Sequence, residues 1–108
     1  MAAAAAQLGA EHTVWANAYK GDVAAVKAAI EANPDGGADV QDTLQGSTPL
    51  HWAAFGGQLP LVQWLVQEAG SDVNVRNNDG CTPLFFACEM CHTDVVQWLV
   101  TEGGEHWQ

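Results

Sequence analysis

Apolar residues recur at helical spacing in two stretches of the second half of the chain. In residues 61–66 the aliphatic side chains fall at Leu61, Val62, Leu65 and Val66. This spacing is typical of one face of a helix, whereas a half-buried strand alternates apolar and polar residues. The same pattern returns 34 positions later, where residues 95–100 read Val-Val-Gln-Trp-Leu-Val. We therefore predict one helix in each stretch.

A shorter helix is predicted before each of these stretches. Residues 46–50 read Gly-Ser-Thr-Pro-Leu and residues 80–84 read Gly-Cys-Thr-Pro-Leu, again 34 positions apart. Threonine before proline is typical of a helix start, because the hydroxyl caps the helix and proline at its first position loses no hydrogen bond. The pair Gly56-Gly57 then ends the first of these helices, since glycine tolerates the left-handed geometry of a helix stop.

A weaker copy of the pattern lies upstream. Residues 14–21 align with residues 50–57 at an offset of 36, and residues 22–30 continue in step with residues 58–66. This copy lacks the Thr-Pro start, as terminal repeats often differ from their neighbours. The predicted segments are an Ala-rich stretch at 1–11, a degenerate N-terminal capping repeat at 12–41, repeats at 42–76 and 77–104, and a tail at 105–108.

The middle unit resembles the ankyrin repeat signature. The resemblance rests on Thr48-Pro49-Leu50-His51-Trp52-Ala53-Ala54, followed by Gly57 and Asp72-Val73-Asn74, and it extends over about residues 12–104. It implies an all-α ankyrin-repeat solenoid of about three stacked helix-turn-helix repeats with short projecting turns. It also implies a non-enzymatic protein–protein interaction module, an adaptor, scaffold or regulator. Phe85 stands where the family usually has histidine, so we expect one weaker turn hydrogen bond there.

Members of the family usually bind partners on a concave face, which the turn tips and the exposed side of each first helix form. Tyr19, Phe55 and Met90 are expected to lie there as an apolar row, one residue per repeat. By alignment with the family, the predicted partner-binding residues are Tyr19, Lys20, Leu44, Gln45, Ser47, Phe55, Asn78, Asp79, Cys81, Glu89 and Met90.

Large residues at matched positions are interpreted as core instead. Trp64 matches Trp98, and Trp52 matches Phe86, so we predict that these four residues pack between repeats. Trp15 is predicted to belong to the core of the first repeat.

The last second helix, at residues 94–101, keeps the inner apolar pattern with no polar substitutions of the kind a terminal cap shows. Three explanations stay open: Trp107 folds back as a lid, this end docks on a partner or a second copy, or the chain is a fragment. Docking would make the chain a structural subunit of a larger assembly. The predicted docking residues are Val95, Trp98, Leu99 and Trp107.

The balance of acidic and basic residues limits the classes of partner that the chain is expected to bind. Thirteen acidic residues and three basic residues give a formal net charge of −10. So few cations disfavour nucleic acid and anionic membranes, and a protein with a basic or largely neutral surface fits better.

No apolar stretch approaches the ~18 residues that cross a bilayer. Three cysteines, an odd number, and no evident secretory signal predict an intracellular, non-secreted protein, cytoplasmic or alternatively nuclear. The acids flank turns and form no catalytic pair, so no enzyme is predicted.

One short motif suggests chemistry. Cys88-Glu89-Met90-Cys91-His92 matches the pattern of covalent haem attachment, and with Cys81 it also offers four zinc-ligand side chains. The repeat alignment favours another interpretation, because Cys88 matches the packed Ala54 and Cys91 replaces Gly57 at a helix end. We expect Cys88 to point into the stack and predict neither a metal nor a cofactor. A zinc- or redox-responsive protein using Cys88, Cys91 and His92 is the alternative.

Overall fold

The computed structural model describes residues 10–32 and 37–103 of the chain. This part contains six α-helices and no strand, so the prediction of an all-α stack of helix pairs is confirmed. A 3-10 turn, η1, covers Gly37–Asp39, and a π-helical turn, η2, covers Leu99–Gly103. The helices are α2 (Ala10–Lys20), α3 (Val23–Ala32), α4 (Pro49–Phe55), α5 (Leu59–Gln67), α6 (Pro83–Glu89) and α7 (Thr93–Trp98).

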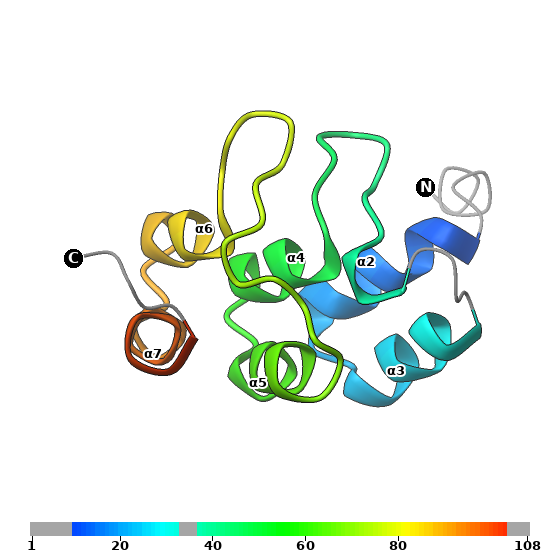
Figure 1. Cartoon of the computed structure of the whole chain (residues 1–108), viewed down its shortest axis with the longest axis horizontal. Coiled ribbons are helices and arrows are strands. Elements are labelled where there is room, and N and C mark those ends of the chain that lie inside the picture. The colour runs from blue at the N-terminus through cyan, green and yellow to red at the C-terminus, as the bar shows by residue number, and fades with distance from the viewer. Residues whose placement is uncertain (1–9, 33–36, 104–108) are drawn as a thin grey trace.

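The helices form three pairs that follow one another along the long axis of the molecule (Figure 1). The first helices α2, α4 and α6 make one row, and the second helices α3, α5 and α7 make the other. Two loops, before α4 and before α6, project from the row of first helices on the side away from the second helices (Figure 1). None of the described helices is both long and apolar enough to span a membrane.

The Thr-Pro pairs start helices as predicted. The backbone N–H of His51 donates to the Oγ1 of Thr48 at 3.4 Å, and that of Phe85 donates to the Oγ1 of Thr82 at 3.2 Å. The turn between the two helices of each repeat contains one residue with positive φ: Gly21 (83°), Gly57 (72°) and Cys91 (60°). Glycine adopts this conformation freely and other residues do so at a cost, so Cys91 is the unusual member of the series.

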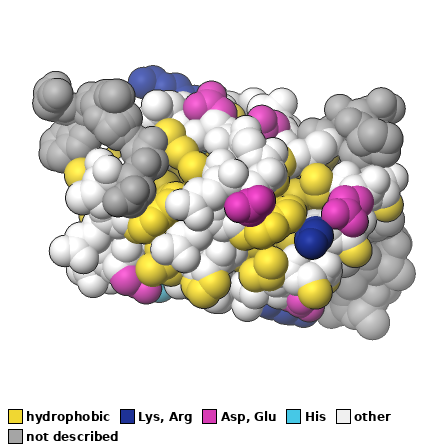
Figure 2. All heavy atoms as spheres, turned by 60° about the horizontal axis from the view of Figure 1, so that its bottom comes forward, with side chains coloured by type: hydrophobic (Ala, Val, Ile, Leu, Met, Phe, Trp, Pro, Cys, Tyr) yellow, Lys and Arg dark blue, Asp and Glu magenta, His cyan; other side chains and the backbone are white. Residues whose placement is uncertain are grey.

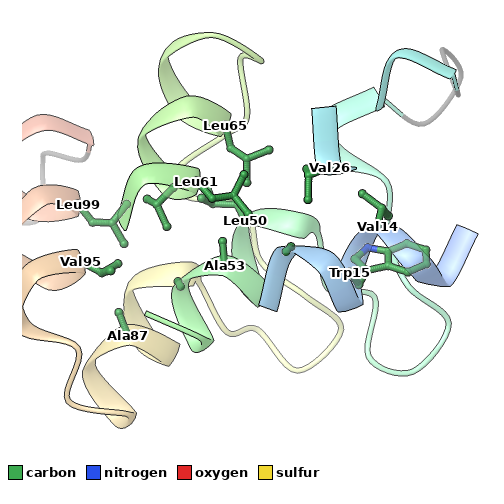
Figure 3. Close-up of a cluster of buried hydrophobic side chains, with 13 residues drawn as sticks. Val14, Trp15, Val26, Leu50, Ala53, Leu61, Leu65, Ala87, Val95 and Leu99 are labelled. Carbon is green, nitrogen blue, oxygen red and sulfur yellow. The ribbon is translucent and has the colours of Figure 1, made fainter. Parts of the chain in front are cut away.

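A continuous apolar core runs through all three pairs, from Val14 and Trp15 to Val95 and Leu99 (Figure 3). Trp15 is buried, as predicted. Trp64 and Trp98 pack against this core but keep part of their surface exposed. The buried apolar residues are Val14, Trp15, Ala18, Val26, Leu50, Ala53, Ala54, Leu61, Val62, Leu65, Ala87, Val95 and Leu99.

One side-chain hydrogen bond recurs between consecutive repeats. The Nε2 of Gln58 donates to the carbonyl oxygen of Tyr19 at 3.0 Å, and the Nε2 of His92 donates to that of Phe55, also at 3.0 Å. Gln58 and His92 are 34 positions apart, and each follows the positive-φ residue of its turn. The bond therefore ties the turn of each repeat to the first helix of the repeat before it.

The end of α4 lies so close to α2 that only glycine fits there. A Cβ atom on Gly56 would overlap the carbonyl oxygen of Tyr19, and it would lie 3.2 Å from the Cδ1 of the same residue. The backbone of Gly56 has φ −85° and ψ −3°, a conformation open to any residue. The requirement for glycine at this position is therefore one of space alone.

Replacing Gly56 by alanine should destabilise the stack. We expect Gly56→Ala to lower the free energy of unfolding by about 1–3 kcal/mol, because α4 must move away from α2. Urea denaturation followed by tryptophan fluorescence measures this loss. The control is Met90→Ala at the matching position of α6, where the side chain is 43% exposed and a change below about 0.5 kcal/mol is expected. Equal effects of the two changes would contradict the steric explanation.

Candidate functional site

Aromatic side chains form a continuous cluster on the first helices, beside the projecting loops. The ring of Phe55 lies 5.7 Å from Tyr19, 6.0 Å from Trp52 and 5.8 Å from Phe86, measured between centroids. Tyr19 also meets Trp52 edge to face at 6.4 Å. Such tilted and edge-to-face contacts are favourable geometries for aromatic pairs, so they hold these rings in fixed relative positions.

Two hollows lie between this cluster and the loops, and we call them together the groove. The first hollow has a volume of about 260 Å³ and the second about 110 Å³, and Trp52 forms a wall of both. The lining of the first is Trp15, Ala16, Tyr19, Lys20, Asp42, Leu44 and Trp52. The lining of the second is Gln45, Ser47, His51, Trp52, Phe55 and Phe86.

Asp42 fixes both the first loop and the shared wall of the groove. Its Oδ1 accepts backbone N–H bonds from Leu44 (3.2 Å), Gln45 (3.0 Å) and Ser47 (3.1 Å), and its Oδ2 accepts the indole N–H of Trp52 at 2.8 Å. Burial of the carboxylate alone would raise its pKa. The hydrogen bonds from Gln45, Trp52, Ser47 and Leu44 outweigh burial, and the pKa of Asp42 is lowered from its ordinary value of 3.8. Asp42 is therefore held as a carboxylate.

The second loop is built in the same way around Asn77 and is joined to the first. The Oδ1 of Asn77 accepts the backbone N–H groups of Asp79 and Cys81, both at 3.0 Å. Its Nδ2 donates to the Oγ of Ser47 at 3.0 Å, and the backbone N–H of Asn78 donates to the carbonyl oxygen of Gln45 at 2.7 Å. The two loops thus form one rigid edge of the groove.

His51 joins α4 to the second loop from within the stack. Its side chain is 1% exposed. The Nδ1 accepts the backbone N–H of Thr48 at 3.0 Å, and the Nε2 lies 2.7 Å from the carbonyl oxygen of Cys81. An amide can only donate and a carbonyl can only accept, so these partners require a neutral imidazole with its proton on Nε2. Burial lowers the pKa of His51 from its ordinary value of 6.5, against smaller opposing contributions from the Cys81 carbonyl and Asp42. At the matching position of the last repeat, the Phe85 side chain has no hydrogen-bonding group, so the bond to the backbone N–H at the start of the helix is absent there, where a weaker bond was predicted.

Most of the predicted partner-binding residues lie at the surface. Among the large hydrophobic residues of this set, Leu44 is 71% exposed, Tyr19 47% and Met90 43%. Phe55 and Cys81 are partly buried. Ser47 lines the second hollow but is almost completely buried beside Asn77, so it is not the exposed turn-tip residue that was predicted. The remaining predicted residues are exposed: Lys20, Gln45, Asn78, Asp79 and Glu89.

The predicted apolar row differs in its last member. Ring contacts run from Tyr19 to Phe55 and then to Phe86, while Glu89, not Met90, occupies the position that matches Phe55. Phe86 and Trp52 were expected to pack between repeats, and their rings do meet those of a neighbouring repeat: Phe86 meets His51 and Phe55, and Trp52 meets Tyr19. Both nevertheless stay partly exposed and line the groove. Trp52 precedes Phe55 by three residues, a spacing that places both side chains on one face of a helix. This spacing could have identified Trp52 as a groove residue from the sequence.

Two of the residues predicted to dock at the C-terminal end are buried. Val95 and Leu99 are 0% and 3% exposed because they fill the core of their own repeat, so they are not available as a surface. Trp98 is partly buried and lines a shallow hollow with Leu59, Asp94, Gln97 and Thr101. Trp107 lies outside the described residues.

The exposed end of the stack is formed by α6 instead. Phe85 is 47% exposed although the matching His51 is 1% exposed, and Leu84 is partly exposed although Leu50 is fully buried. Cys88 is exposed although Ala54 is fully buried, so the prediction that Cys88 points into the stack is wrong. The physical reason is that α6 covers α4, whereas none of the described residues forms a further helix pair that covers α6.

The side of the second helices has a different character. Figure 2 turns this side forward, and hydrophobic side chains reach the surface there in several places, separated by polar groups and carboxylates. Within the described residues, no group of three or more histidine, cysteine, aspartate or glutamate side chains is gathered so as to hold a metal ion. The imidazole of His92 is engaged with the carbonyl of Phe55.

A family model described as ankyrin repeats (3 copies) matches residues 13–108. The match covers most of the chain, and the chain belongs to the ankyrin repeat family. Ankyrin repeats are generally protein–protein interaction modules, and the family is typically non-enzymatic.

Exchanging the Asp42 carboxylate for an amide should weaken the loop and the groove together. In Asp42→Asn an oxygen can still accept the three backbone N–H groups, but the amide N–H₂ then faces the indole N–H of Trp52. We expect a loss of about 1–3 kcal/mol in the free energy of unfolding at neutral pH. Folding lowers the pKa of Asp42, so the carboxylate contributes to the free energy of unfolding above pH 3.8. This contribution is lost as the pH falls through the pKa of Asp42 in the folded protein, which is lower than 3.8.

The difference in stability between wild type and Asp42→Asn should therefore shrink below about pH 4, as urea denaturation at a series of pH values would show. The matched control is Asp72→Asn, since Asp72 accepts a single exposed backbone bond, from Asn74 at 2.9 Å. A constant difference at all pH values would exclude the carboxylate as its origin.

Proposed function

We propose that this chain is a protein-recognition module, an adaptor or regulator, that binds a protein partner in the groove between its first helices and its loops. The observation that carries the proposal is the pair of hollows on either side of Trp52, with aromatic walls and exposed apolar rims at Tyr19 and Leu44. Exposed apolar surface of this kind on a small domain is typical of interaction sites, and aromatic residues are enriched in interface cores.

The fixed geometry of the groove supports tight recognition. Asp42 holds the turn that carries Leu44, and the same carboxylate holds the indole of Trp52. A surface that is already ordered before binding loses less conformational entropy when the partner arrives. Leu44 is therefore held as a rigid apolar projection beside the first hollow. A partner would place a side chain in the hollow and at the same time pack its own surface around Leu44.

The charges around the groove favour a basic or neutral partner. Asp79 in the second loop and Glu89 in α6 are exposed, and Lys20 lines the first hollow. The net charge of −10 adds a long-range attraction for basic surfaces. Such charges mainly raise the association rate and select the partner, while the apolar contacts carry most of the affinity.

A narrower resemblance gives one lead to the partner. Residues 15–22, together with Thr43-Leu44-Gln45-Gly46 and Pro49-Leu50-His51, are similar to myotrophin, a small ankyrin protein that binds actin capping protein. The similarity fades in the last repeat. Several of these residues form the first loop and the walls of the first hollow. Capping protein is accordingly a sensible first protein to test for binding.

The alternative proposal, docking through the C-terminal end, now centres on Leu84, Phe85 and Cys88. These residues are more exposed than their matched residues in the middle repeat. A partner that covers α6 would take the place that α6 takes on α4. This alternative predicts a different set of sensitive residues, so one set of variants separates the two proposals.

The test compares three variants with wild type in a quantitative capture experiment, using capping protein and native cell extract. Tyr19→Ala with Leu44→Ala alters the groove, Phe85→Ser alters the end of the stack, and Ala24→Ser with Ala28→Ser alters exposed positions of α3 as a control. We expect the groove variant to lose at least about tenfold in partner affinity, since truncated anchors typically cost 1 kcal/mol or more each.

The Phe85 and α3 variants should keep full binding, and circular dichroism should show all variants equally folded. A partner that binds the groove variant as well as wild type would contradict groove recognition. A partner that is lost only with Phe85→Ser would instead establish the end of the stack as the docking surface.

A further inference from the structure

Two of the three cysteines stand at the two ends of one tight turn. Cys88 is in the last turn of α6 and Cys91 follows the helix, with only Glu89 and Met90 between them. The backbone N–H of Cys91 donates to the carbonyl oxygen of Cys88 at 3.1 Å, which closes a four-residue turn. Cys91 has φ 60°, the left-handed conformation that terminates a helix.

The same turn occurs in every repeat, which fixes its geometry. The N–H of Gly21 donates to the carbonyl of Ala18, and the N–H of Gly57 donates to that of Ala54, each at 3.1 Å. Closed turns of this kind bring their first and last Cα atoms within about 7 Å. A disulfide spans a Cα separation of about 4.4–6.8 Å, so a closed turn brings Cys88 and Cys91 close to the separation that a disulfide needs.

Both thiols are accessible and neither is engaged elsewhere in the fold. Cys88 and Cys91 are free and exposed. Cys88 owes its exposure to its place at the end of the stack, because the matching Ala54 is completely buried. Cys81 belongs to another part of the fold: its backbone N–H binds Asn77 and its carbonyl binds His51, within the second loop. The pair Cys88 and Cys91 is therefore the pair that local geometry favours.

We propose that Cys88 and Cys91 form a reversible disulfide by exchange with a low-molecular-weight disulfide. One cysteine loses its thiol proton and attacks a sulfur of the small disulfide, whose S–S bond breaks and releases a thiolate. The second cysteine, also deprotonated, attacks the protein sulfur of the mixed disulfide and displaces the other small thiolate. The two released thiolates take up the two protons. Two protein thiols are oxidised and one small disulfide is reduced to two thiols.

The disulfide would change the surface at one end of the groove. Glu89 and Met90 lie inside the ring that the bond closes, and both are exposed residues predicted to contact a partner. Closing the ring restricts the conformations of both. Oxidation is thus expected to alter any binding that uses this end of α6. The thiol chemistry itself does not depend on the proposed function and can be tested without a partner.

The test uses wild type and a Cys81→Ser variant, each incubated under native conditions with hydroxyethyl disulfide. This probe is neutral, so the net charge of −10 does not repel it. Free thiols are then alkylated in denaturant, and the chain is cut after glutamate. Cleavage at Glu89 separates Cys88 from Cys91, and the neighbouring cuts fall at Glu68 and Glu102. A bond between Cys88 and Cys91 keeps fragments 69–89 and 90–102 together until reduction.

We expect the intact chain to lose the mass of two hydrogen atoms, and the two fragments to stay linked in both proteins. Cys88→Ala and Cys91→Gly restore the residues of the middle repeat at these positions, so both variants should fold. Each should stop at a single mixed disulfide with the probe at the remaining cysteine of the pair. Three results would each overturn the proposal. Wild type could carry separate probe adducts on Cys88 and Cys91, both thiols could stay unreacted, or the linked fragments could depend on Cys81.

Discussion

The stack depends on the neutral imidazole of His51, which two repeats share. One ring nitrogen accepts the N–H of Thr48 and so caps α4, and the other donates to the carbonyl of Cys81 in the following loop. Both partners are backbone groups inside the protein, where an unsatisfied donor or acceptor is costly. A single side chain thus fixes the start of a helix and the position of the next loop. Phe85 cannot do either, and α6 belongs to the last helix pair of the described stack.

The groove follows from this arrangement of the loops. Because the second loop is held by His51 and joined to the first loop through Asn77 and Asn78, the two loops form one edge above the first helices. Asp42 then anchors Trp52 against that edge. The recognition surface is therefore a product of backbone and buried polar bonds, while its apolar rings provide the contact area. This separation allows the lining residues to vary between ankyrin proteins while the framework is kept.

The repeat offsets of 34 and 36 were enough to predict the helix pairs and their order, and the Thr-Pro pairs predicted the caps of α4 and α6, since these features depend on local sequence. Exposure was harder to predict because it depends on neighbours. Ser47 looked like a turn-tip contact but is buried by the adjacent loop, and Cys88 looked packed because Ala54 is, although nothing described covers α6. The exposed parts of Trp52 and Phe86 were missed for the same reason. Alignment of the repeats shows that the two residues occupy equivalent positions, but it does not show which helix face the next repeat leaves uncovered.

The state of the His51 ring tests the account most directly. Long-range ¹H–¹⁵N correlation spectra, assigned with a His51→Gln variant, report both the tautomer and the protonation of the imidazole. At pH 6.5, where an imidazole with the ordinary pKa is half protonated, we predict a predominantly neutral ring with its proton on Nε2. Because folding lowers this pKa, stability should fall as pH drops below 6.5, where the unfolded chain takes up the proton first. A proton on Nδ1, or protonation of the folded protein at or above pH 6.5, would contradict the account.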